Sequence, residues 1–223
     1  MRGLDSSGGL SGKWAYVRSD TGASAKVADA GTYTRHDDQF EQVMAYFWVN
    51  ESQEYLQSLG FGTELPGAND HAQVPGFGTS LEAGSIGEAW GDYLAVSVGA
   101  YADAKYGWPA KADLACVADW DSASYSDAPH CLRRIDSDKT YADREGEVHA
   151  DGEIWSRALF DIRGKLGART ADRIIVNAQF GFAPDTSFED AAVTTIATAQ
   201  KMYGKGAADA VRKAFQDREI PGV

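Results

Sequence analysis

Hydrophobic residues recur at helical spacing over most of this chain. The clearest run extends from residue 81 to residue 106, where apolar side chains repeat every three to four positions and predict one long amphipathic helix. Five further runs predict helices in the same way. They span Asp37 or Asp38 to Leu59, Glu147 to Gly164 or Gly167, and about residues 170–180, 187–203 and 207–218.

Glycine- and proline-rich stretches separate these helices. Residues 60–80 hold five glycines and two prolines and predict a long loop, and residues 108–145 are polar and irregular. Short runs at residues 14–17 and 31–34 predict strands. The pattern indicates a mainly α fold, with a β- and loop-containing N-terminal part at residues 1–35 and a helical body at residues 36–223.

Composition and charge narrow the class of protein. The chain is 43% hydrophobic and 24% charged, which is ordinary for a globular protein, and its net charge is −12 without any basic run. Nucleic acids and anionic membranes both need clustered Lys and Arg, so neither is an expected partner. No stretch approaches the roughly 20 apolar residues of a membrane span. The first five residues lack the apolar core of a signal peptide, so we expect a cytosolic chain or the mature piece of a longer precursor.

Two cysteines, Cys116 and Cys131, bracket one irregular loop. A disulfide between them would close a loop of about 15 residues and stabilise the fold by roughly 3 kcal/mol. Two unpaired cysteines in a cytosolic protein are the alternative, and the spacing alone leaves both open.

Two carboxylates on the long helix raise the main chemical question. Glu88 and Asp92 are four residues apart and share one helix face among apolar neighbours. Burying them is costly unless a metal ion, a histidine or a basic side chain neutralises them. The candidates are His149 and the adjacent pair Arg133 and Arg134.

Each of these candidate residues also has a non-catalytic interpretation. His149 begins a helix among acidic residues, which suits a general acid or an electrostatic stabiliser but is also a common surface arrangement. Arg133 and Arg134 could simply pair with local aspartates. Other chemistries lack their motifs, because the sequence has no Gly-x-Ser-x-Gly, no phosphate-binding Gly-rich loop and no Gly-x-Gly-x-x-Gly.

Three stretches together resemble a known family. Residues 87–92 read Gly-Glu-Ala-Trp-Gly-Asp, residues 147–155 read Glu-Val-His-Ala-Asp-Gly-Glu-Ile-Trp, and residues 45–50 read Ala-Tyr-Phe-Trp-Val-Asn. They are similar to motifs of the fungalysin family of zinc metalloendopeptidases, relatives of thermolysin, and especially of its secreted bacterial members. The resemblance covers nearly the whole chain and implies the thermolysin-like catalytic domain, a helical bundle.

The resemblance also implies a function and residue roles. It implies a secreted zinc endopeptidase that cleaves polypeptides with metal-activated water. Glu88 would be the third zinc ligand, and Asp92 would orient a ligand histidine. His149 would donate to the oxyanion of the tetrahedral intermediate. Arg133, more loosely, would hold the substrate carbonyl.

One departure from the family is large. The His-Glu-x-x-His signature, which supplies two zinc ligands and the general base, belongs between Gly60 and Glu88 and is absent. None of the four histidines, at positions 36, 71, 130 and 149, has the required partner. Taken by itself, this sequence is not a peptidase.

Three explanations follow. In the first, which we favour, an internal segment of the natural protein is absent from this sequence, near the junction of Asn69 and Asp70. In the second, the deletion is genuine and the protein is a non-catalytic relative that serves binding or structure. In the third, the chain is a disulfide-stapled helical interaction domain unrelated to peptidases.

Overall fold

The computed structural model of the chain describes residues 1–20, 22–68, 73–111 and 113–223. The expected junction at Asn69 and Asp70, and also His71, lie outside the described residues. The chain divides by packing into two compact units, Met1–Gly60 and Phe61–Val223. This division does not test the predicted organisation, in which one catalytic domain runs through both parts of the chain.

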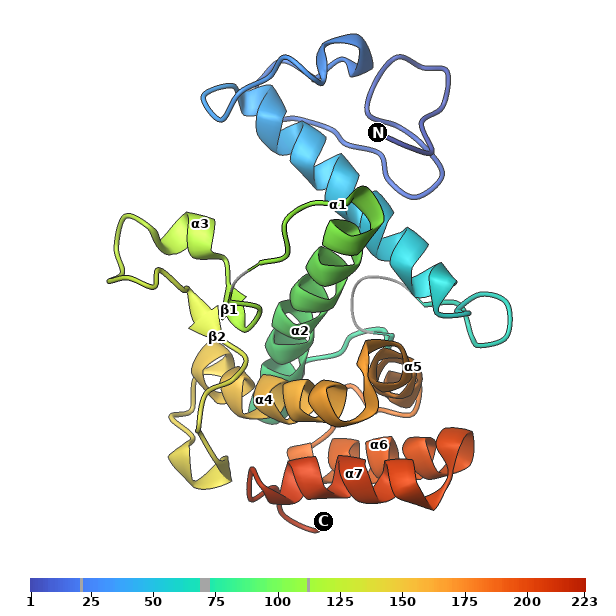
Figure 1. The fold of residues 1–223 in the computed structure, drawn as a ribbon, viewed down its shortest axis with the longest axis vertical. Helices are drawn as coiled ribbons and strands as arrows, with labels where there is room; N and C mark the ends of the chain where they lie inside the picture. Colours follow the sequence, from blue (N-terminus) through green and yellow to red (C-terminus); the bar gives the residue numbers. More distant parts are fainter. Residues whose placement is uncertain (21, 69–72, 112) are drawn as a thin grey trace. The chain divides into compact units, whose positions relative to one another are not determined.

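The first unit is built around one helix. A short 3₁₀ turn, η1 (Val27–Asp29), precedes α1 (Asp38–Ser58), as Figure 1 shows. The predicted helix start is confirmed, although the Asp37 carboxylate accepts from the Thr34 amide at 2.7 Å and does not cap the helix. A small core gathers on the fully buried Tyr46, whose hydroxyl donates to the Arg2 carbonyl.

The two strands predicted in this unit are wrong. Residues 14–17 contribute only an isolated bridge between Ser11 and Tyr16, and residues 31–34 form a turn and a loop in which the Thr32 amide bonds to Asp29. A β-favourable run becomes a strand only when a second strand completes its ladder, and no such partner lies among the described residues of this unit.

The second unit is mainly helical, as predicted. Its long helices match the predicted ones to within a few residues, and its two strands are two residues each. The elements are α2 (Leu81–Tyr106), β1 (Cys116–Val117), α3 (Asp119–Ser122), β2 (Arg133–Arg134), η2 (Tyr141–Asp143), α4 (Val148–Leu166), α5 (Ala168–Gln179), α6 (Phe188–Tyr203) and α7 (Lys205–Gln216).

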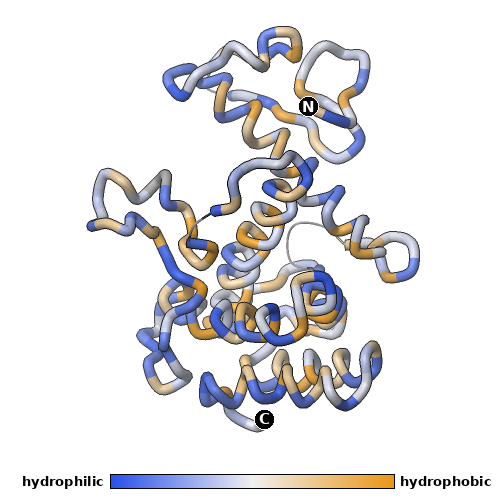
Figure 2. The backbone as a smooth tube through the Cα atoms, viewed as in Figure 1, coloured by the Kyte–Doolittle hydropathy of each residue, from blue (hydrophilic) through white to orange (hydrophobic). Residues whose placement is uncertain are grey.

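The helices of the second unit share one apolar core. α2 packs mainly on α4, α4 also contacts α5 and α7, and α6 packs between α5 and α7. Trp155 of α4 lies at the centre, stacked on Phe215 at 4.7 Å between ring centroids and tilted against Phe188 at 5.2 Å. In Figure 2, hydrophobic and hydrophilic stretches alternate along α7, as expected for a helix with one buried face.

A smaller core holds the two-stranded ribbon. β1 and β2 pair antiparallel, with Cys116 opposite Arg134 and Val117 opposite Arg133. Val117 and Ile135 are buried together with Ala115 and with Val96 of α2. The ribbon therefore lies against α2, and this contact positions the arginines that it carries.

Candidate active site

α2 presents Glu88 and Asp92 on one face, one helical turn apart. The helix begins where the Ser80 hydroxyl accepts from the Ala83 amide, and it ends at Gly107, which adopts the left-handed conformation with φ 66°. The two carboxylates differ in exposure: the Asp92 side chain is 9% exposed and that of Glu88 is 42%. Because its charge is buried, Asp92 is the carboxylate that needs a positively charged or hydrogen-bonding partner.

Asp92 has that partner in Arg133. Nε of Arg133 donates to Oδ2 of Asp92 at 2.6 Å, and Nη2 donates to Oδ1 at 2.7 Å. This is the two-pronged geometry that suits guanidinium and carboxylate best. The hydrogen bonds to Asp92 raise the pKa of the Arg133 side chain, and the nearby charges of Glu88 and Glu153 raise it further.

Glu88 faces His149 at the start of α4. Nδ1 of His149 lies 3.1 Å from Oε2 of Glu88, and both side chains are about half exposed. Glu147 caps this end of α4, because its carboxylate accepts from the amides of His149 and Ala150. These backbone hydrogen bonds lower the pKa of Glu147. The cap fixes the first turn of α4 and with it the position of His149.

Glycines let α2 and α4 approach closely at this point. A Cβ on Gly152 of α4 would lie 3.1 Å from the Ser85 carbonyl oxygen, and one on Gly84 of α2 would lie 2.9 Å from Cγ1 of Val148. A larger residue at either position would push the helices apart. The close crossing is what brings the start of α4 within reach of Glu88.

The four predicted active-site residues thus lie together. Glu88, Asp92, Arg133 and His149 come from α2, β2 and α4, and each carboxylate has its own basic neighbour. Arg134 points elsewhere: its guanidinium binds the carboxylates of Asp113 and Asp136, and these hydrogen bonds raise its pKa.

Comparison with known proteins places this arrangement in a family. The family described as "Thermolysin metallopeptidase, alpha-helical domain" matches residues 76–220, which include all four residues and both helices. The chain belongs to the thermolysin metallopeptidase family. No curated protein sequence matches it. The narrower assignment to the fungalysin branch stays a prediction, and the third explanation, a domain unrelated to peptidases, is wrong.

A solved structure shares the fold. The structure titled "Precursor of Protealysin, Metalloproteinase from Serratia proteamaculans" superposes with a TM-score of 0.64 at 15% sequence identity. The match covers 92% of this chain and 82% of that one. At this identity the similarity establishes the fold alone.

Thermolysin-family membership implies zinc in general, but the residues described here do not complete a zinc site. A catalytic zinc takes three protein ligands and leaves one position for water, whereas Glu88 and His149 offer two donors. Within the described ranges, one group of three metal-capable side chains lies close enough, Asp113 with Cys116 and Cys131. Its sulfurs form a disulfide and cannot act as thiolate ligands. No reaction step through a metal is therefore assigned to these residues.

The disulfide answers the question that the cysteine spacing left open. Cys116 and Cys131 are bonded, with their Cα atoms 5.2 Å apart. Cys116 belongs to β1, and Cys131 precedes Arg133 by two residues. The covalent link therefore lies beside the ribbon that carries Arg133.

A buried polar network behind the site was not predicted from the sequence. Asp172 of α5 accepts from the hydroxyl of Tyr93 and lies 3.3 Å from the Arg163 guanidinium, which also donates to the Ser97 hydroxyl at 2.9 Å. Burial, and next the charge of Asp172, raises the pKa of Tyr93 well above its usual value. The network connects α2, α4 and α5. Its signal in the sequence was an aspartate within an apolar helical run.

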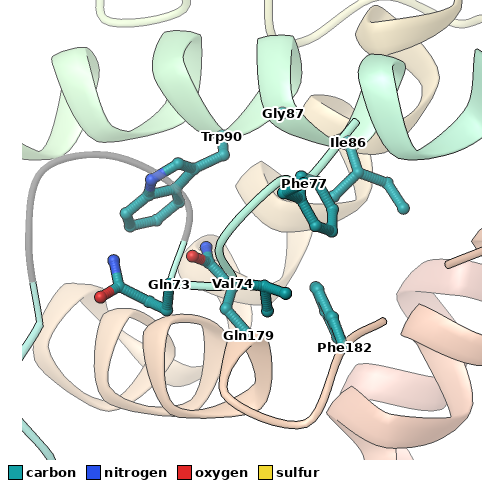
Figure 3. A pocket seen from close by; sticks show the side chains of 8 residues that line it. All are labelled: Gln73, Val74, Phe77, Ile86, Gly87, Trp90, Gln179 and Phe182. Carbon is teal, nitrogen blue, oxygen red and sulfur yellow. The ribbon is translucent and has the colours of Figure 1, made fainter. Parts of the chain in front are cut away.

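A small apolar pocket lies on another side of α2 (Figure 3). Phe77 packs on the bare backbone of Gly87 and stacks with Phe182. The cavity volume is about 10 Å³, enough for about one water molecule. The buried Trp90 Nε1 and Gln179 Oε1 have no hydrogen-bond partner among the described residues, and both side chains line this pocket. The pocket is separate from Glu88 and His149.

Proposed function

We propose that this chain is the helical catalytic portion of a secreted zinc-dependent endopeptidase whose two zinc-binding histidines and general base lie in a segment that this sequence lacks. One observation carries the proposal. Glu88, His149 and the Asp92–Arg133 pair lie together at the crossing of α2 and α4, within the region that matches the thermolysin family. Polypeptides would be the substrates.

The roles proposed for the four residues are those that the family resemblance implies, and the chemistry of the side chains suits them. Glu88, half exposed, would be one of three zinc ligands. Both carboxylate oxygens of Asp92 accept from Arg133, and Asp92 would orient a ligand histidine through a further lone pair on one of them. His149 would donate a hydrogen bond to the developing oxyanion. Arg133 would direct its remaining guanidinium N–H groups to the substrate carbonyl.

Two observations support secretion, the disulfide and the acidic net charge. The Cys116–Cys131 disulfide is typical of oxidising compartments, where such bonds persist. Among the described helices, none is long and apolar enough to cross a membrane. The acidic net charge of −12 suits a protein that works free in solution.

A non-catalytic relative is the second candidate, and the same contacts are compatible with it. Glu88 already lies 3.1 Å from His149, and Asp92 is already paired with Arg133, so both carboxylates have a neighbouring partner without a metal. A chain with a genuine deletion could keep this site as a structural remnant or a binding surface. In that case the natural protein would contain residues 60–88 without an insertion.

The tryptic map and the metal content distinguish the two candidates. We expect the tryptic map of the natural gene product to contain extra peptides between residue 60 and residue 88. We expect it to carry one equivalent of zinc, and to lose casein cleavage on chelation or in Glu88→Gln. Lys205→Ala, an exposed change in α7, is the matched control and keeps full activity.

Two other outcomes would contradict the peptidase proposal. A natural protein without extra peptides between residue 60 and residue 88 that binds no zinc and leaves casein intact would overturn the peptidase proposal and establish the non-catalytic relative. A protein that has the extra peptides and zinc but cleaves no casein would exclude both the remnant and the assigned reaction.

A further inference from the structure

Arg133 reaches Asp92 from a ribbon that has little stability of its own. β1 and β2 are two residues each, and the Leu132 amide to Val117 and the Ile135 amide to Ala115 extend the pairing by one hydrogen bond on each side, both at 3.0 Å. A two-stranded pairing this short is not stable in water without further support. The position of the Arg133 guanidinium therefore depends on what holds the ribbon.

Noncovalent contacts hold one side of the ribbon. Ile135 and Val117 pack against Val96 of α2, one turn beyond Asp92. The Arg134 amide donates to Oε1 of Glu153 on α4 at 3.1 Å. These contacts connect the ribbon to both helices of the site, but they act on Val117, Arg134 and Ile135 and not on the loop that enters β2.

The disulfide holds that entry. Cys131 lies two residues before Arg133, and its bond to Cys116 closes a loop with a sequence separation of 15. The remainder of this loop, residues 123–130, is irregular and mostly exposed. Without the bond, the chain entering β2 is restrained by the Leu132 amide and by a contact of 3.5 Å between the Arg134 guanidinium and Cys131 Sγ. The Arg133 backbone then gains freedom that the two bonds to Asp92 must overcome.

We propose that the Cys116–Cys131 disulfide is a redox-sensitive clamp that positions the Arg133 guanidinium against Asp92. A dithiol reductant opens the clamp with two electrons and two protons. The S–S bond breaks, the two cysteines become thiols, and the dithiol is oxidised to its own disulfide. Arg133 then exchanges between its paired and unpaired states more often. The clamp itself involves neither zinc nor substrate, and only its consequence for holding a substrate carbonyl rests on the proposed function.

The side-chain Nε–H of Arg133 reports on the clamp directly. Hydrogen exchange of this group is measured by ¹H–¹⁵N NMR on the chain as it stands, and its signal is assigned by its loss in Arg133→Lys. On reduction we expect exchange at least about tenfold faster, because local opening of the pair becomes easier. The same acceleration is expected in Cys116→Ser/Cys131→Ser, in which further reductant changes nothing.

An internal control separates clamping from general unfolding. The amide of Ile174, buried within α5, reports the stability of the helical core in the same sample. Faster exchange at Arg133 with unchanged exchange at Ile174, reversed by reoxidation, supports the clamp. Unchanged exchange at Arg133 after complete reduction overturns it. Equal acceleration at both groups also overturns it, because the disulfide would then stabilise the whole unit and not Arg133 in particular.

Discussion

The Arg133 guanidinium donates two parallel hydrogen bonds to the Asp92 carboxylate, at 2.6 and 2.7 Å, across a sequence separation of 41 residues. The pair joins the ribbon to the long helix beside Glu88. Because Asp92 is 9% exposed, its charge is largely removed from water and its stability depends on this one partner.

Arg133→Ala is expected to destabilise the second unit by about 3 kcal/mol, because it leaves a buried carboxylate without a counter-charge. The double variant Arg133→Ala/Asp92→Ala should recover part of this loss, since no unpaired charge remains. Urea unfolding of the four members of the cycle measures both effects. Lys205→Ala, which removes an exposed ion pair on α7, is expected to cost less than about 0.5 kcal/mol. Equal losses in Arg133→Ala and the double variant would contradict the coupling.

Gly152→Ala should separate α2 from α4. The new Cβ meets the Ser85 carbonyl oxygen at 3.1 Å, and backbone cannot yield as a flexible side chain does, so we expect a loss of about 1–3 kcal/mol. The contact between His149 and Glu88 should weaken with it. Thermal unfolding measures the loss, and the His149 ring signals in NMR report the contact.

A second glycine, on the partner helix α2, provides the control for Gly152→Ala. Gly91 of α2 has open space around its Cβ position, so Gly91→Ala should stabilise the helix by about 0.5–1 kcal/mol. If both alanine variants moved stability in the same direction, close helix approach at Gly152 would not be the cause.

The long helices could be predicted because their signals are local. The apolar period of α2, the Ser80 cap and the left-handed Gly107 all lie within the stretch that they define. The structure of the N-terminal part could not be predicted in this way. Whether residues 14–17 form a strand depends on a distant partner strand and not on their own side chains.

The site was predictable in part. Similarity to family motifs identified Glu88 and His149, and the shared helix face of Glu88 and Asp92 required a metal ion, a histidine or a basic side chain nearby. Spacing alone could not decide which partner each carboxylate takes, because pairing across 41 residues is set by how the ribbon packs on α2. Asp172 was missed because an aspartate in a predicted helix is ordinarily exposed, and its burial, at 2% exposure, is set by how α5 packs.

Glu147 makes the start of α4 sensitive to acid. Its folded-state pKa is lowered below the ordinary value of 4.5 by the amides of His149 and Ala150. A lowered carboxylate pKa contributes stability above the unfolded value, and this contribution is lost as the pH falls through the folded value. The stability difference between the natural chain and Glu147→Gln should therefore be constant near pH 7 and shrink below about pH 4.5. Unfolding in urea across this range measures it, and a difference that stays constant into strong acid would contradict the cap.

Tyr93 makes the stability of the helical core depend on pH in the alkaline range, whereas Glu147 acts in the acidic range. Burial and the adjacent Asp172 hold its pKa well above the ordinary value of 10.0, so the folded state keeps a proton that the unfolded state releases. Stability should therefore fall as the pH rises above about 10, and it should fall less steeply in Tyr93→Phe, which has no hydroxyl to ionise.

At neutral pH, Tyr93→Phe should lower the free energy of unfolding by about 1–3 kcal/mol, because Asp172 loses a buried hydrogen bond. Urea unfolding between pH 8 and pH 11 of Tyr93→Phe and of the exposed control Tyr16→Phe tests both expectations. The same alkaline slope in all three proteins would show that Tyr93 ionises as freely as a surface tyrosine.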